Sequence, residues 1–302
     1  MAMMHHVLES REYKLLLEFS HFDANPTLEL ANSFWDQRIK PTIEGRLGKR
    51  GRNSRAEEWF ATAEVKSVRF WDTSACLLTR CNYALRERVS NRKEGSRKQQ
   101  REITLKLRMP DMFVVAATSL RGAQGAKIAF EEDIAPLEVA DQSYPTSKVA
   151  ISTPRSIRSR FSLSISIKGV ASEPSTLSYA AALFPTLLTN LEARGALASR
   201  SNQLQHGPAI QEHVFKGAKV RLASGTTGEF ALTIWHFAPP EPVRGVAEIS
   251  FKCGFENGTM PGAAAQRAFD LFIGLQEDLG NGLDLQHPSK TELALPLGCR
   301  GE

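Results

Sequence analysis

Apolar and polar residues alternate over much of the chain, and a period of two predicts β-strands. The clearest case is residues 159–170, "SRFSLSISIKGV", where Ser alternates with Phe, Leu and Ile. Successive side chains of a strand point to opposite faces, so this segment presents one apolar and one polar face. Similar patterns predict further strands at residues 12–20, 65–73, 82–89, 102–108, 126–134, 218–224, 229–237 and 246–255.

Helical spacing is confined to a few segments. The predicted helices span residues 25–39, 54–65 and 263–279. Asn25 is the expected N-cap of the first, and Gly280 ends the last. Residues 176–191 fit either element type, whereas the polar residues 90–101 and 198–208 fit loops. Antiparallel strands with peripheral helices are typical of an α+β fold.

Charged side chains gather on one face of several predicted strands. Arg86 and Arg88 share a face of one strand, and Lys106 and Arg108 share a face of the next. Carboxylates and lysines share faces elsewhere, namely Glu12 with Lys14, Glu131 with Asp133, and Glu248 with Lys252. A sheet with one solvated side gives the same pattern, so the alternation leaves open whether these faces meet bulk water or a cavity.

The composition fits a globular protein with a substantial core. The chain has 302 residues, 42% of them hydrophobic, which allows one large domain or two modest ones. The net charge of +5 is small, but Lys and Arg concentrate in residues 38–55 and 86–108, so local positive potential matters more. No segment approaches the ~20 apolar residues of a membrane helix, and the first residues lack an apolar signal core. We therefore expect a cytoplasmic protein without a membrane partner.

Other reactive side chains indicate no familiar site. The sequence has no Gly-x-Ser-x-Gly motif and no phosphate-cradling Gly-rich loop. We expect His236, between two aromatic residues, to be a packed histidine rather than a base. The cysteines show neither Cys-x-x-Cys spacing nor a histidine at zinc-ligand spacing, which predicts reduced thiols at Cys76, Cys81, Cys253 and Cys299.

Several stretches, in the same order, resemble one known family. They are "RFWDTSACLLTRCNYALRERV", "EITLKLR", "AEISFKCGFENG" followed by an amphipathic helix, and "HPSKTELAL". The chain thereby resembles the CYTH domain of the triphosphate tunnel metalloenzyme superfamily, most closely the long-form bacterial inorganic triphosphatases. The resemblance covers most of the chain and implies a single domain over residues 1–302, with a poorly matching insertion or irregular region at about 141–228.

The resemblance implies a closed antiparallel β-barrel whose polar faces line a tunnel. Cations in the tunnel would bind the oxygens of a triphosphate, and carboxylates would hold Mg²⁺ or Mn²⁺. The implied phosphate-binding residues are Arg86, Arg88, Lys106, Arg108, Lys252 and Lys290. The implied metal ligands are Glu12, Glu131, Asp133 and Glu248.

The chain departs from the family where carboxylates are expected. An opening Glu-x-Glu-x-Lys strand is replaced by Glu12-x-Lys14-x-Leu16 or, in a shifted register, by Lys14-x-Leu16-x-Glu18, and either register loses a carboxylate. Glu248-x-Ser250 stands in place of a later Glu-x-Glu. Trp235 lies near a position where the family tends to have Asp. Each departure removes a hard oxygen ligand, so the tunnel could hold an anion while failing to hold the metal.

Three functions remain open at this point. The first is metal-dependent hydrolysis of an inorganic or organic triphosphate. On this interpretation the chain is a phosphohydrolase whose activity is weak, because acidic metal ligands are missing. The second is a catalytically degenerate tunnel that binds a triphosphate, nucleotide or polyphosphate without turnover. The third is nucleic-acid binding through basic loops such as residues 46–55, although a lone basic loop is more often a solvated surface.

Overall fold

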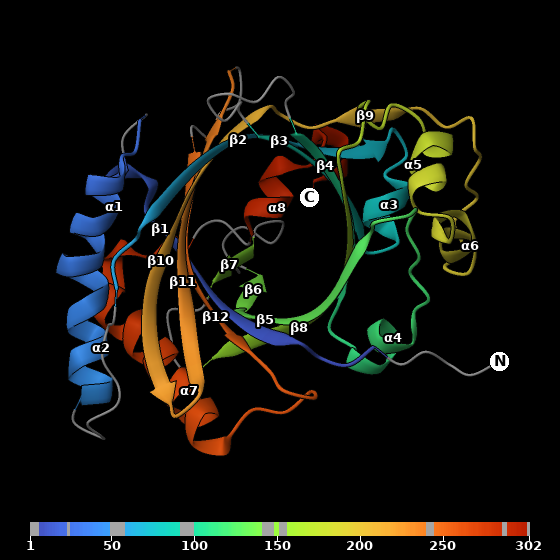
Figure 1. Cartoon of the computed structure of the whole chain (residues 1–302). Coiled ribbons are helices and arrows are strands. Elements are labelled where there is room, and N and C mark those ends of the chain that lie inside the picture. Colours follow the sequence, from blue (N-terminus) through green and yellow to red (C-terminus); the bar gives the residue numbers. More distant parts are fainter. Residues whose placement is uncertain are drawn as a thin grey trace.

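The main feature of the chain is a closed β-barrel. The computed structural model describes residues 6–22, 25–48, 58–90, 100–140, 148–150, 156–239, 245–285 and 289–300. Among these, nine strands form a ring in the order β10-β11-β12-β1-β5-β8-β4-β3-β2, and β2 pairs back to β10 (Figure 1). Neighbouring strands are antiparallel except β1 and β5, which are parallel. The predicted α+β barrel with peripheral helices is therefore confirmed, with one parallel pairing inside it.

The strands lie close to their predicted positions. Their bounds are β1 Ser10–Leu17, β2 Thr62–Thr73, β3 Tyr83–Ser90, β4 Gln100–Met109, β5 Lys127–Pro136, β8 Ile157–Lys168, β10 Ile210–Ala223, β11 Thr226–Phe237 and β12 Gly245–Gly254. A short strand, β9 (Leu204–His206), adds to the edge of β2 within the segment predicted as a loop. β6 (Glu138–Ala140) pairs with β7 (Lys148–Ala150) outside the ring. Assignment of the whole chain to one domain stays a prediction.

The barrel has its apolar faces outside. Leu105, Ile165 and Ile249 point away from the lumen and are fully buried beneath helices. Helices α1 (Leu28–Phe34), α2 (Lys40–Leu47) and α7 (Gly262–Leu279) cover one side of the ring (Figure 1). The other side is covered by α3 (Leu77–Arg80), α4 (Met112–Ala117), α5 (Leu177–Leu183) and α6 (Leu187–Glu192). Because the helices bury the outward faces, the alternate positions of the strands remain for the lumen.

The first helical region is longer than predicted. Thr27, not Asn25, is the N-cap, and its Oγ1 accepts a hydrogen bond from the Leu30 backbone N–H at 3.2 Å. α1 continues through a π-helical turn, Trp35–Ile39, into α2. The ambiguous residues 176–191 are mainly helical, in α5 and α6.

The predicted helix at residues 54–65 is wrong for its last part. Residues 54–57 lie outside the described residues, residues 58–61 are irregular, and β2 starts at Thr62. Pairing with β10 explains the difference, since Thr62 lies opposite Lys216 and Val65 opposite His213. The ladder hydrogen bonds that close the barrel outweigh the local helical preference.

The C-terminal segment occupies one end of the ring. Helix α8 (Lys290–Ala294) lies within the ring in Figure 1. Ala294 and Leu295 pack against a cluster that includes Phe70, Trp235 and Val246 from three strands. The end of α8 thus buries an apolar surface inside an otherwise polar barrel.

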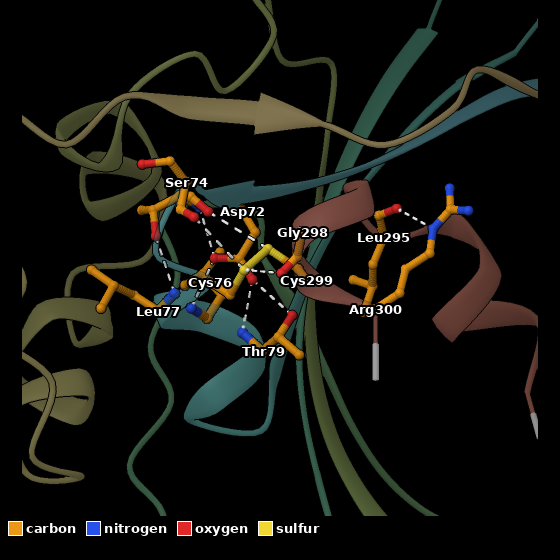
Figure 2. The surroundings of a disulfide bond; sticks show 11 residues. Asp72, Ser74, Cys76, Leu77, Thr79, Leu295, Gly298, Cys299 and Arg300 are labelled. Carbon is orange, nitrogen blue, oxygen red and sulfur yellow. Dashed lines mark hydrogen bonds between the residues drawn. A yellow bond between two sulfur atoms is a disulfide. The ribbon is translucent and has the colours of Figure 1, made fainter. Parts of the chain in front are cut away.

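A disulfide bond joins this segment to the wall. Cys76 and Cys299 are bonded although 223 residues separate them (Figure 2). The prediction of reduced thiols is therefore wrong for this pair, because sequence spacing does not show that the C-terminal segment returns to the end of β2. Cys81 and Cys253 are free and buried. No helix in the described part of the chain has the length and apolar character to cross a membrane.

Candidate functional site

The predicted site residues share the inner face of the barrel. Arg86 lies opposite Thr104 in the β3–β4 register, and Ala84 lies opposite Lys106, so both cations face the same side. Glu12 lies opposite Asp133 in the β1–β5 pair and opposite Lys252 in the β1–β12 pair. By the same alternation, Arg88, Arg108, Glu131 and Glu248 lie on this face as well. Lys290 enters from α8.

A cavity of about 80 Å³ lies on this face where β1, β5 and β8 meet the C-terminal segment. Charged side chains make up much of its lining, among them Lys14, Arg108, Asp133, Arg160, Glu248 and Lys290. These residues come from five different strands and from α8. The barrel therefore brings together charges that are far apart in the sequence.

Asp133 is the centre of the ion-pair network. Its carboxylate lies 2.8 Å from Lys14 Nζ, 3.4 Å from Lys106 Nζ and 3.0 Å from Arg108 Nη2. Burial alone would raise the pKa of Asp133, but these three cations hold it well below its ordinary value. One ionised carboxylate is thus surrounded by three positive charges.

The neighbouring cations and burial also affect the protonation of Lys106. Burial lowers the pKa of Lys106 to about 8, and Arg108 and Lys14 act in the same direction against the carboxylate of Asp133. A second negative group near Lys106 would stabilise its charged form. The site is therefore electrostatically suited to an anion.

Arg86 and Arg88 form a second basic group on β3. Arg88 Nη2 donates a hydrogen bond to Glu212 Oε1 at 2.7 Å, and Trp235 Nε1 donates to the same oxygen at 2.9 Å. Among the described residues, none forms an ion pair with Arg86, and its buried Nε has no hydrogen-bond partner. Burial and the neighbouring Arg88 lower the pKa of Arg86 to about 9. In the described part of the chain, the carboxylates of Glu212 and Glu102 therefore compensate the charge of Arg86 only in part and without a direct ion pair.

The predicted metal ligands are each paired with a lysine. Lys14 Nζ lies 3.0 Å from Glu12 Oε2 and also contacts Asp133, and Lys290 Nζ lies 2.5 Å from Glu248 Oε1. Lys252 pairs with Glu131.

Divalent cations bind oxygens at about 2.0–2.6 Å, yet here ammonium groups contact these oxygens. Within the described ranges, no three His, Cys, Asp or Glu side chains are grouped so as to hold a metal ion. The carboxylates as they lie do not fit Mg²⁺ or Mn²⁺.

The departures from the family pattern also lie on this face. Ser250 is opposite Lys14 in the β1–β12 register. Trp235 lies beneath Lys290, whose Nζ is 5.1 Å from the ring centroid in a cation–π contact. His236 points to the other side and packs edge-on against Phe19, with 5.3 Å between ring centroids. Its packing agrees with the structural role expected for it.

The sequence reasoning did not name several charged residues of the lumen as site candidates, among them Glu212 and Arg160. Glu212 is fully buried and belongs to the region for which no motif was found. Arg160 lies opposite Asp133 in the β5–β8 register. It lies on the same face of β8 as Ser162 and Ser164 and within the predicted strand at residues 159–170, so following the polar face of that strand back to its start would have found it. The basic residues 49–55 and the connection 91–99 lie outside the described residues.

Comparison with known proteins gives only distant similarities. No model of a protein family and no curated protein matches the chain. Among solved structures, a candidate adenylyl cyclase of Hippeastrum with a dominant triphosphatase activity is 13% identical, with 94% of this chain and 93% of that chain covered and a TM-score of 0.40. A candidate adenylate cyclase of Bacillus halodurans is 12% identical, with 92% of each chain covered and a TM-score of 0.37. The protein PH1819 of Pyrococcus horikoshii is 10% identical, with 92% of this chain and 94% of that chain covered and a TM-score of 0.31. At these low TM-scores, the description of the barrel rests on its own strand pairing.

Proposed function

We propose that the barrel binds the triphosphate group of a small molecule in its lumen. The observation that carries this proposal is Arg86, a half-buried arginine that faces the lumen, has no direct ion pair among the described residues and has a buried Nε without a hydrogen-bond partner. Arg88 lies two residues further along β3. Lys106 and Arg108, on the next strand β4, share the carboxylate of Asp133 on β5. A bound anion would stabilise all four charges.

A linear triphosphate has the chemistry that such a lumen needs. It carries several negative charges along an extended chain, and arginine offers planar pairs of donors that match phosphate oxygens. Cations on several walls of the barrel can contact such a chain from more than one side. They face inward, so they favour a slender ligand over a nucleic-acid duplex. Because the carboxylates beside these cations are paired with lysines and do not fit Mg²⁺ or Mn²⁺ as they lie, binding without turnover is the function that the geometry supports best.

Hydrolysis of the bound triphosphate is the second candidate. It is favoured by the position of the carboxylates, because Glu12 and Asp133 are register partners and Glu131 lies two residues before Asp133. These groups stand next to the cations proposed to hold the phosphates. Phosphate release from tripolyphosphate, measured with and without Mg²⁺ or Mn²⁺, separates the two candidates.

Calorimetric titration with tripolyphosphate tests the proposal. Arg86→Ala and Lys106→Ala should each weaken binding by about 1.5–3 kcal/mol, the typical contribution of a hydrogen bond to a charged group. Arg69→Ala is the matched control, because Arg69 points outward from β2 and pairs with Glu173 at 3.3 Å. Wild-type affinity in both lumen variants, or an equal loss in the control, would contradict the assignment.

A further inference from the structure

Lys14 lies between two carboxylates of neighbouring strands. Its Nζ is 3.0 Å from Glu12 Oε2 and 2.8 Å from Asp133 Oδ1. Glu12 and Asp133 are register partners in the parallel pair β1–β5, so both side chains leave the wall at the same level. A divalent cation that bridged these two carboxylates would need the space that this ammonium group fills.

The ammonium differs from a metal ion in ways that matter here. A bound Mg²⁺ exchanges with solvent, whereas the Lys14 ammonium is attached to the wall by its own side chain. Only 19% of that side chain is exposed. Displacing it would leave a buried positive charge without its partners, which is unfavourable. Metal binding at this position is therefore in competition with a permanent internal cation.

The surrounding charges leave a positive surplus. Lys106 and Arg108 also contact Asp133, so three cations share the carboxylates of Glu12 and Asp133. Arg86 adds a further positive charge on the same inner face, and it has no direct ion pair within the described ranges. A ligand that neutralises this surplus must itself be strongly negative.

We infer that Lys14 takes the place of a divalent cation and that the tunnel prefers a polyphosphate group free of metal. This inference rests on the proposed triphosphate binding and makes Lys14 the residue that sets the preference. A Mg²⁺ ion carried by the ligand would cancel two of its negative charges and would be repelled by the Lys14 ammonium. Inorganic tripolyphosphate and a nucleoside triphosphate share the required chemistry.

The first experiment compares free and metal-bound ligand. Tripolyphosphate and ATP are titrated separately into the wild-type protein, once with EDTA and once with excess Mg²⁺. Binding should occur in EDTA, and excess Mg²⁺ should weaken it by about tenfold or more, the equivalent of losing one charged hydrogen bond. A response to tripolyphosphate alone identifies an inorganic chain as the ligand, and a response to both identifies the shared triphosphate group. Binding that requires Mg²⁺ would overturn the inference.

The second experiment measures metal binding without any phosphate ligand. Loss of the electron paramagnetic resonance signal of free Mn²⁺ reports binding. Lys14→Met releases the two carboxylates and Lys14→Glu adds a third, so both variants should bind Mn²⁺ while the wild type does not. Lys168→Glu makes the same charge change at a side chain that is 60% exposed, and it should behave like the wild type. Circular dichroism verifies the fold of each variant.

The outcomes distinguish failure of this inference from failure of the proposed function. Stoichiometric Mn²⁺ binding by the wild type, or its absence in folded Lys14 variants, overturns the role of Lys14 and leaves triphosphate binding intact. Absence of tripolyphosphate and ATP binding under both conditions overturns the proposed function, and this inference with it. If neither Lys14 variant folds, the wild-type titrations alone decide.

Discussion

Replacing Glu212 with Gln should destabilise the protein and strengthen anion binding at the same time. The Glu212 carboxylate is fully buried between β10 and the lumen. It accepts hydrogen bonds from Arg88 at 2.7 Å and from Trp235 at 2.9 Å. A glutamine of the same size can still accept from Trp235, but it removes the negative charge opposite Arg88. The half-buried Arg88 guanidinium would then remain without its ion-pair partner.

The size of the effect follows from the titration of Glu212. Burial raises its pKa, but Arg88 outweighs burial and lowers the pKa from 4.5 to about 2. A difference of this size corresponds to about 3 kcal/mol of folding free energy. Because the pKa is lowered on folding, the contribution is complete above 4.5, the unfolded value, and is lost as the pH falls towards 2. Glu212→Gln should therefore lower the free energy of unfolding by about 3 kcal/mol near neutral pH.

Urea unfolding followed by circular dichroism measures this difference. The gap between wild type and variant should be constant above 4.5 and shrink as the pH falls below it. Glu229→Gln, an exposed carboxylate on the neighbouring strand β11, is the control and should change stability by no more than about 0.5 kcal/mol. In calorimetry, Glu212→Gln should bind tripolyphosphate more tightly because Arg88 is released. A gap that does not respond to pH would refute the assigned ion pair, and weaker tripolyphosphate binding would refute the role given to Arg88.

Two further predictions concern the segment that fills one end of the barrel. Reduction of the Cys76–Cys299 disulfide should lower the free energy of unfolding by about 2–5 kcal/mol, because it releases a loop of 223 residues. Thermal unfolding with and without reductant measures this loss of stability, and equal unfolding midpoints would contradict the prediction. Gly207→Ala would place a Cβ 2.1 Å from the Ala294 carbonyl oxygen and should cost about 1–3 kcal/mol, whereas Gly254→Ala meets no atom within 4 Å and should cost less. Equal melting temperatures for the two variants would refute the close approach of α8 to Gly207.

The sequence supports prediction of the strands and of their faces. Period-two alternation assigned Arg86 and Lys106 each to the polar face of its strand, and the β3–β4 register places both on one side of the sheet. Alternation could not show that this side is the inside of a barrel, because an ordinary solvated sheet has the same pattern. The family resemblance supplied the closed ring, and pairing of β2 with β10 confirms it.

The ion pairs of the lumen could not be predicted from the sequence, because they depend on distances between strands that are far apart in the chain. The contact between Lys14 and Asp133 joins residues from different parts of the chain, and no local pattern indicates which carboxylate a lysine will meet. The same holds for Arg88 and Glu212, since β2 lies between their strands in the ring. Local preference also misled at residues 62–65, where pairing with β10 imposes a strand.

The distribution of charge along the lumen accounts for the stability of the barrel and supports the proposed binding of an anion. Buried charges are costly unless they are paired, and most lumen lysines meet this condition by contacting a carboxylate of the same wall, as Lys252 does with Glu131 and Lys290 with Glu248. On β3 and β4 the balance differs, because Arg86 has no ion pair among the described residues and Lys106 shares Asp133 with two other cations. These two strands therefore carry cations whose charge the described carboxylates compensate only in part. A triphosphate that binds there can interact with the under-compensated cations first and leave the remaining ion pairs of the barrel in place.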